Sequence, residues 1–457
     1  MGKVTAITEG SIWKQLLLYF FPILFGTFFQ QLYNTADAVI VGHFVGKEAL
    51  AMVGGSSAIL TNLVVGFFVG LATGATVLIA QFYGAKSEKS VSRAVHTSII
   101  FALAGSVVMT GFGILFMRPI LVRMGTPSEI MDGSLLYLRI YFFGIAGSLV
   151  YNMGAGILRA VGDSRRPLYF LIASCLTNIV LDLLFVAAFR MGVAGAAYAT
   201  VISQLVSAGL AVGTLMREKD SYRLDPGKLR LDPYLLRRIL QIGFPAGVQA
   251  VLYSLSNLVI QSAINALGTD TVAAWAAYGK IDQLFWMVIN ALGISVTTFV
   301  GQNYGAGKLD RVHRGTAESL VIGAFFAVAL SAGIWFCGRT VFGFFTADPD
   351  VLRIGMEMLH FMCPLFILYV AIEVFSGALR GVGDSLFPMV ATAIDICVLR
   401  VVWIFLAVPV HPGLRTVMFS YPLTWGLGSV VFLVYYLWFS PLRRFRKNPK
   451  PRGLRKL

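Results

Sequence analysis

Long apolar stretches dominate this sequence. A helix needs roughly 20 apolar residues to cross about 30 Å of hydrocarbon, and Gly, Pro and charged residues divide the chain into twelve runs of that kind. They cover residues 14–43, 50–82, 93–117, 134–159, 167–189, 192–216, 238–266, 271–302, 314–338, 352–379, 388–409 and 414–440. Of the 457 residues 57% are hydrophobic and 13% charged, about half the charge of a soluble domain. The sequence therefore predicts an all-α integral membrane protein with twelve transmembrane helices and excludes a soluble globular enzyme or a disordered chain.

The distribution of basic residues predicts the orientation. If both termini are cytoplasmic, the inner connections and ends hold 27 Lys and Arg residues and the outer connections hold 8, as the positive-inside bias requires. The net charge of +15 is thus explained by topology and not by binding to nucleic acid. The tail 441–457 is expected to contact the anionic inner leaflet of the cell membrane.

The second half of the chain repeats the first. GILRAVGDSRRP at 156–167 returns as GALRGVGDSLFP at 377–388, and AQFYGAKSEKSVSR at 80–93 aligns with GQNYGAGKLDRVHR at 301–314. A unit with an even number of helices places both copies in the membrane with the same orientation. We predict an N-terminal six-helix lobe (1–216), a cytoplasmic linker (217–237), a pseudo-symmetric C-terminal six-helix lobe (238–440) and a basic cytoplasmic tail (441–457).

Polar residues inside the apolar helices of the first half indicate a cation site. Gln30, Asn34 and Asp37 share one face of the first helix, and Asn178 and Asp182 share one face of the fifth. At a rise of 1.5 Å per residue, Asp37, Asp182 and Thr200 reach similar depths in the outer half of the membrane. Two carboxylates close together at low dielectric do not easily both stay charged, so the pair is expected to take up H⁺ or Na⁺. A buried hydrogen-bond cluster that only locks the helices together is the alternative.

The second half has different chemistry. Asn257 matches Asn34, but Ile260 takes the place of Asp37. Its buried charges include Lys280, Asp282 and Glu373, which could bind a substrate or neutralise one another as ion pairs. We expect partners for Glu373 in Lys280 and Arg400. Aromatic residues, Tyr253 and Tyr369 among them, could offer faces to an organic cation.

The sequence lacks the motifs of the common membrane enzymes. It has no G-x-x-x-x-G-K-[ST], H-E-x-x-H or G-x-S-x-G motif. A transporter without a cofactor is therefore expected, with H⁺ or Na⁺ as the coupling ion.

Three motifs together resemble those of the multidrug and toxic compound extrusion (MATE) transporters of prokaryotes. They are QQLYNTADAVIVGHFVGKEALA at 30–51, the paired Q-x-Y-G-A segments and the paired G-x-L-R-x-V-G-D segments. The resemblance extends over nearly the whole chain. It implies two six-helix lobes that export cationic drugs against an inward flow of H⁺ or Na⁺.

The resemblance also implies a set of site residues. The first-lobe cation site of prokaryotic members falls on Asp37, Asn152, Asn178, Asp182 and Thr200, although depth alone left Asn152 uncertain. Na⁺, if it is the coupling ion, would be held by Asp37 and Asp182. Pro22 falls where the family has a helix-one proline associated with bending. The second-lobe acids of another branch fall on Tyr253 and Tyr369, so the resemblance implies no second-lobe cation site.

These observations predict a cation-coupled antiporter that exports organic cationic or amphiphilic drugs and toxic compounds by alternating access. Its expected partners are small organic cations and the lipid bilayer, with no nucleic acid, and a monomer is expected. The predicted substrate-binding residues are Gln30, Asn34, Tyr253, Asn257, Lys280, Asp282, Tyr369 and Glu373. A lipid-linked precursor flippase of the wider superfamily is the alternative, which the scarcity of cationic residues in the spans argues against.

Overall fold

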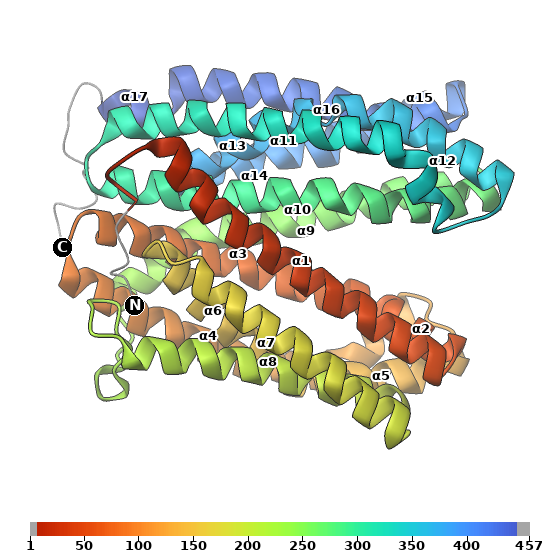
Figure 1. The fold of residues 1–457 in the computed structure, drawn as a ribbon, viewed down its shortest axis with the longest axis horizontal. Coiled ribbons are helices and arrows are strands. Elements are labelled where there is room, and N and C mark those ends of the chain that lie inside the picture. Colours follow the sequence, from red (N-terminus) through yellow and green to blue (C-terminus); the bar gives the residue numbers. More distant parts are fainter. Residues whose placement is uncertain (1–6, 446–457) are drawn as a thin grey trace. The chain divides into compact units, whose positions relative to one another are not determined.

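The computed structural model describes residues 7–445 and places nearly all of them in helices (Figure 1). Ten of these helices are long and apolar enough to cross a membrane. Two further crossings are bent pairs, Ser128–Phe143 with Ile145–Ala160 at 47° and Pro349–Leu365 with Ile367–Gly381 at 50°. Counted with these pairs, the described chain has up to twelve spans, and each coincides with one of the twelve predicted apolar runs. The basic tail lies mostly outside the described residues.

The bounds of the helices follow the predicted runs closely. In the first half they are α1 (Ile12–Phe44), α2 (Lys47–Gly54), α3 (Ser56–Gly84), α4 (Glu88–Arg123), α5 (Ser128–Phe143), α6 (Ile145–Ala160), α7 (Arg165–Asp182) and α8 (Gly192–Arg217). In the second half they are α9 (Pro233–Asn265), α10 (Thr269–Gly305), α11 (Leu309–Gly343), α12 (Pro349–Met362), α13 (Ile367–Gly381), α14 (Leu386–Thr392), α15 (Arg400–Val410), α16 (Leu414–Val434) and α17 (Pro441–Phe445). π-helical segments continue α7 over Leu183–Ala188 and join α14 to α15 over Ala393–Leu399.

The described chain packs into two compact units. The first unit holds Phe21–Gly247, and the second holds Ile7–Phe20 together with the residues from Val248 onward. In the first unit α6 packs against α3, α4 and α8, and α7 packs along α8. In the second unit α10 packs against α11, α12 and α13, and α13 packs against α16.

Two pairs of glycines bring α3 and the beginning of α9 into backbone contact in the first unit. Gly70 and Gly74 on α3 face Gly243 and Gly247 on α9, each pair spaced as G-x-x-x-G. A Cβ added at Gly74 would collide with the Ile239 carbonyl oxygen, and one at Gly243 would lie 2.5 Å from the Leu71 carbonyl oxygen. Small residues at this spacing allow the close helix approach common in membrane proteins.

The duplicated V-G-D-S segment forms the same turn in both units. Gly162 and Gly383 have φ values of 100° and 93°, a conformation that favours glycine. The following aspartates then accept backbone N–H groups of the next helix: Asp163 Oδ1 lies 3.1 Å from Arg166 N, and Asp384 Oδ1 lies 3.4 Å from Phe387 N. The repeat is therefore a structural repeat of a capped helical turn.

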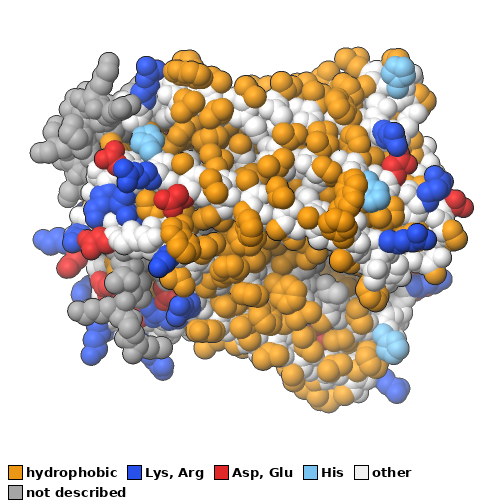
Figure 2. All heavy atoms as spheres, turned by 45° about the horizontal axis from the view of Figure 1, so that its top comes forward, with side chains coloured by type: hydrophobic (Ala, Val, Ile, Leu, Met, Phe, Trp, Pro, Cys, Tyr) orange, Lys and Arg blue, Asp and Glu red, His pale blue; other side chains and the backbone are white. Residues whose placement is uncertain are grey.

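The surface has the division expected of a membrane protein. Figure 2 shows hydrophobic side chains over the middle of the helices and charged side chains gathered near the helix ends. The exposed hydrophobic residues within the membrane-spanning helices include Val107 and Leu115 on α4 and Val321 and Phe336 on α11. Exposure of such side chains along whole helices suits contact with lipid and not with water.

Candidate functional site

Three helices of the first unit bring the predicted cation-site residues together. Asp37 lies on α1, Asn178 and Asp182 lie one turn apart on α7, and Thr200 lies on α8. All four are buried, with Asn178 and Asp182 at 0% exposure. The carboxyl groups of Asp37 and Asp182 are immediate neighbours.

Many polar atoms of this cluster have no hydrogen-bond partner outside the cluster. Twelve buried side-chain atoms of the described residues lack one, and seven belong to this region: Asp37 Oδ1, both Asn178 side-chain atoms, both Asp182 oxygens, Thr200 Oγ1 and Gln204 Oε1. An unsatisfied buried polar group costs about 1 to 3 kcal/mol and a charged one more. The cluster therefore contains oxygen atoms that are not used in contacts between the helices.

The local sequence explains how α7 presents its acid. Ser174 Oγ donates to the Ser203 carbonyl oxygen at 2.8 Å, which ties α7 to α8 one turn before Asn178. Directly after Asp182 the helix widens into the π-helical segment Leu183–Ala188. Such segments occur mostly as single turns inside α-helices, frequently at functional sites.

Sequence reasoning missed four neighbours of the cluster. Tyr137 on α5 lies near both carboxyl groups, and Tyr33 and Tyr141 lie close to Gln204. The Tyr137 and Tyr141 rings stack with centroids 6.3 Å apart. A signal was available in the sequence, because Tyr137 and Tyr141, and likewise Thr200 and Gln204, are four residues apart and share a helix face.

Asn152 and Pro22 belong to the same unit but not to the cluster of unpaired atoms. Asn152 is half-buried on α6, and its Nδ2 donates to the Ser148 carbonyl oxygen at 2.8 Å. Pro22 lies inside α1, where it leaves the Leu18 carbonyl without its usual helical donor. Gln30 and Asn34 are exposed on the same helix.

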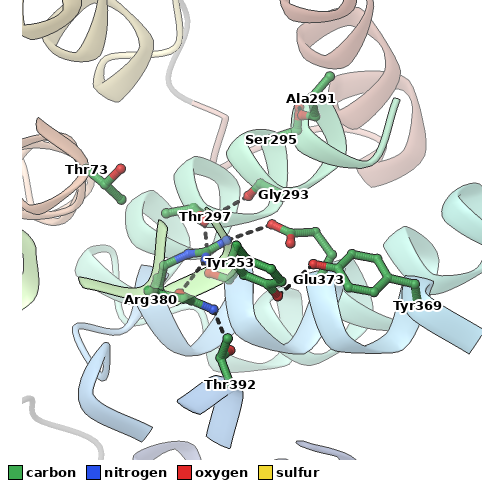
Figure 3. A network of polar contacts seen from close by, with 12 residues as sticks. Thr73, Tyr253, Ala291, Gly293, Ser295, Thr297, Tyr369, Glu373, Arg380 and Thr392 are labelled. Carbon is green, nitrogen blue, oxygen red and sulfur yellow. Dashed lines mark hydrogen bonds and ion pairs between the residues drawn. The ribbon is translucent and has the colours of Figure 1, made fainter. Parts of the chain in front are cut away.

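In the second unit Glu373 pairs with Arg380 and not with Lys280 or Arg400. Arg380 Nη2 lies 2.7 Å from Glu373 Oε1, and both side chains are largely buried. Figure 3 shows the surrounding network of polar contacts, which includes Glu373, Arg380 and Thr392. Gln249 Nε2 donates to Thr392 Oγ1 at 2.9 Å. Lys280 is exposed, and Arg400 instead donates to Thr424 Oγ1 at 3.0 Å and stacks on Tyr421. The expected partners of Glu373 were therefore wrong.

The other second-half residues have different surroundings. The hydroxyls of Tyr253 and Tyr369 lie 2.8 Å apart, and Tyr369, at 2% exposure, packs on Trp286 and Trp425 in an aromatic core. Asp282 accepts from Tyr278 Oη at 3.1 Å and from Trp286 Nε1 at 2.7 Å. Asn257 is exposed.

The donor set in the first unit suits a proton or a hard alkali cation. It offers carboxylate, amide and hydroxyl oxygens, which hard cations prefer. Within residues 7–445 no group of three or more His, Cys, Asp or Glu could hold a transition metal. The residues present therefore fit H⁺ or Na⁺.

Comparison with known proteins agrees with this architecture. The MatE family profile matches the chain twice, at residues 22–184 and 245–406. The chain belongs to the MATE family. The two matches fall on the two halves of the internal repeat, and membership confirms that the chain is a transporter and not an enzyme.

Individual MATE relatives cover most of the chain. A probable multidrug resistance protein of Bacillus subtilis, YoeA, is 29% identical over 84% of this chain and 84% of its own length. A probable multidrug resistance protein of Thermotoga maritima, NorM, is 27% identical over 85% of this chain and 84% of its own. A crystal structure of MATE in a bent conformation superposes with a TM-score of 0.90 at 23% identity, covering 98% of this chain and 99% of that one. That likeness confirms the predicted MATE fold.

Proposed function

We propose that the protein is a cation-coupled antiporter that exports organic cationic or amphiphilic drugs and toxic compounds by alternating access. The observation that carries the proposal is the buried pair of Asp37 and Asp182, whose neighbouring carboxyl groups have partnerless oxygens. A buried acid pair of this kind is stable only when a cation or proton reduces its charge. Membership of the MATE family and similarity to probable multidrug resistance proteins of bacteria support drug export.

In this proposal the first unit performs the coupling. Asp37 and Asp182 hold the H⁺ or Na⁺, and Asn178 and Thr200 supply neutral oxygens beside them. Asn152 belongs to the proposed set through its position in the family, and it would need to release Ser148 to join. Pro22 acts as the gating residue on the helix that carries Asp37.

The second unit contributes to substrate binding and not to coupling. Glu373 and Asp282, two of its acids, already have donors within the unit. The proposed substrate set has four exposed members, Asn257 and Lys280 in the second unit and Gln30 and Asn34 on α1 in the first. Its remaining members position the polar and aromatic side chains around them: Tyr253, Tyr369, Glu373 and Asp282.

We further propose the topology and organisation that the charge bias and the repeat predict. Both termini lie in the cytoplasm of a multi-pass protein of the cell membrane. The lobes at 1–216 and 238–440 are joined by the linker at 217–237, and the tail at 441–457 contacts anionic lipid. A single copy carries the whole transport cycle.

The test is dye efflux from proteoliposomes with the pH gradient and the sodium gradient imposed separately. Efflux of a cationic dye driven by at least one gradient is expected, and the gradient that works identifies the coupling ion. Asp132→Asn is a matched control, since it removes a carboxylate from an exposed position of α5 that belongs to no proposed site. Dye efflux that neither gradient drives would overturn the proposal. Movement of a fluorescent lipid-linked pyrophosphate between leaflets would favour the flippase.

A further inference from the structure

Two buried side-chain amides hold the segment that leads into α1. Gln302 Oε1 accepts from Ile7 N at 2.8 Å, and Asn303 Nδ2 donates to the Ile7 carbonyl oxygen at 3.1 Å. Both amides are at 0% exposure, and Ile7 itself is buried. Gln302 and Asn303 belong to the second Q-x-Y-G-A motif, which the transport site does not use.

Arg311 and Lys308 extend the same contact along the segment. Arg311 Nη1 donates to the Gly10 carbonyl oxygen at 2.8 Å, its Nη2 to Gln15 Oε1 at 3.1 Å and its Nε to Asn303 Oδ1 at 3.0 Å. Lys308 Nζ donates to the Thr8 carbonyl oxygen at 2.9 Å. Because all three nitrogens of the guanidinium are used, the contact fixes both the position and the direction of the segment.

The held segment continues directly into α1. In the second unit Tyr19 Oη donates to Thr298 Oγ1 at 3.2 Å, and the Phe20 and Phe326 rings lie 5.1 Å apart. Pro22 follows two residues later, and the same helix carries Asp37.

The first unit holds its own pre-helix segment in a comparable way. In the segment before α9, the Asp225 N–H group donates to His96 Nε2 at 3.1 Å. The Asp232 N–H group donates to Thr97 Oγ1 at 3.2 Å. Arg93, in the region that follows the first Q-x-Y-G-A motif, forms an ion pair with Asp232. In each unit, residues in or after this motif thus hold the segment before the first helix of a repeat.

We propose that Asn303 and Arg311 are positioning residues that anchor the start of α1, so that a change at Asp37 bends the helix at Pro22 instead of shifting its whole length. This rests on the proposed function, because it assigns the anchored helix to cation coupling. A helix that is free at both ends could shift along its whole length when the cation binds. Cation binding would then not bend the helix at Pro22.

Spin labels test the anchor independently of transport. Ser11 and Val321, both exposed and both in the second unit, are changed to Cys in a background with the four native cysteines replaced. A narrow Ser11–Val321 distance distribution is expected, unchanged between low and high pH or with and without Na⁺. The variant N303A/R311Q should broaden it. A distribution that stays narrow in that variant would overturn the anchor.

Transport then tests the positioning role. N303A/R311Q should lower the maximum rate of gradient-driven efflux about tenfold, or about 1.4 kcal/mol of activation free energy, while the cation concentration for half-maximal activation stays unchanged. Arg314→Gln removes a charge from an exposed position on the same helix and should retain the normal rate. A freed segment with a normal efflux rate would refute the positioning role. If instead Asp37→Asn leaves gradient-driven efflux unchanged, the proposed function fails. The spin-label result still decides whether the anchor exists.

Discussion

Glu373 and Arg380 lie two turns apart on α13 and form an ion pair with Arg380 Nη2 2.7 Å from Glu373 Oε1. The pair is mostly buried, and a Cβ added at Gly293 on α10 would collide with the Glu373 carboxylate. The acid is therefore enclosed by α10 and neutralised by its own helix. This arrangement gives Glu373 a structural reason to be present, which a test must separate from substrate binding.

Glu373→Gln should destabilise the protein by about 2 to 3 kcal/mol, because it leaves the buried Arg380 charge without its partner. Thermal unfolding in detergent measures the loss. The double variant E373Q/R380Q should recover much of it, since no unpaired charge remains. If E373Q keeps its thermal stability and loses only affinity for cationic substrates, Glu373 is a substrate ligand instead.

Asp37→Asn should reduce gradient-driven efflux by about tenfold or more and leave the fold intact, as should Asp182→Asn. The amide keeps the shape of the side chain but cannot exchange a proton or offer a charge to Na⁺. Efflux from proteoliposomes measures the effect, with size-exclusion profiles as the check on folding. Normal coupled efflux in either variant would contradict the first-unit site.

Gly74→Ala should destabilise the first unit by about 1 to 3 kcal/mol, the usual cost of overpacking a tight contact. The added methyl group would meet the Ile239 carbonyl oxygen, which is backbone and cannot rotate away. Gly209→Ala on α8 is the matched control, because a Cβ there meets no atom within 4 Å. Equal thermal stability of the two variants would show that the glycine contact is unimportant.

Asp232 links pH to the attachment of the segment before α9. Burial opposes ionisation, but the Leu235 N–H group and Arg93 outweigh it and hold the pKa of Asp232 below its usual value. A lowered pKa means that the contribution is fully present above the unfolded pKa of about 3.9 and is lost as pH falls through the folded pKa. Asp232→Ala should therefore cost about 1 kcal/mol at neutral pH and less in strong acid. Limited proteolysis of the linker across this pH range measures the difference, and a pH-independent cost would contradict it.

The spans and the acid cluster were predictable because both depend on simple spacing. Bilayer thickness sets the length of an apolar run, and the helical repeat places Asn178 and Asp182 on one face. The bend between α5 and α6 was not predictable in this way. It occurs at Gly144, where a Cβ would collide with the Val201 side chain of α8, so it depends on tertiary packing.

Contacts within one helix could be predicted from sequence spacing, whereas contacts between helices could not. The seven-residue spacing places both side chains on one face of α13 and could have indicated the pair. The hydrogen bond between Tyr253 and Tyr369 could not be found from spacing, because it joins α9 to α13. The anchor on Ile7 likewise joins residues about 295 positions apart.

Pro22→Ala should slow drug exchange without removing cation binding. Proline weakens the helical ladder of α1, and neutralising Asp37 changes its repulsion with Asp182, so the helix has two arrangements whose populations the cation shifts. Spin labels at the exposed Val39 on α1 and Val180 on α7, both in the first unit, report the movement. Their distance should differ between low and high pH or with and without Na⁺ in the native sequence, and should change less in Pro22→Ala. Pro119→Ala, which removes a proline from α4, should behave as the native protein. Identical distances under all conditions would refute bending at Pro22 as the means by which the cation moves the helix.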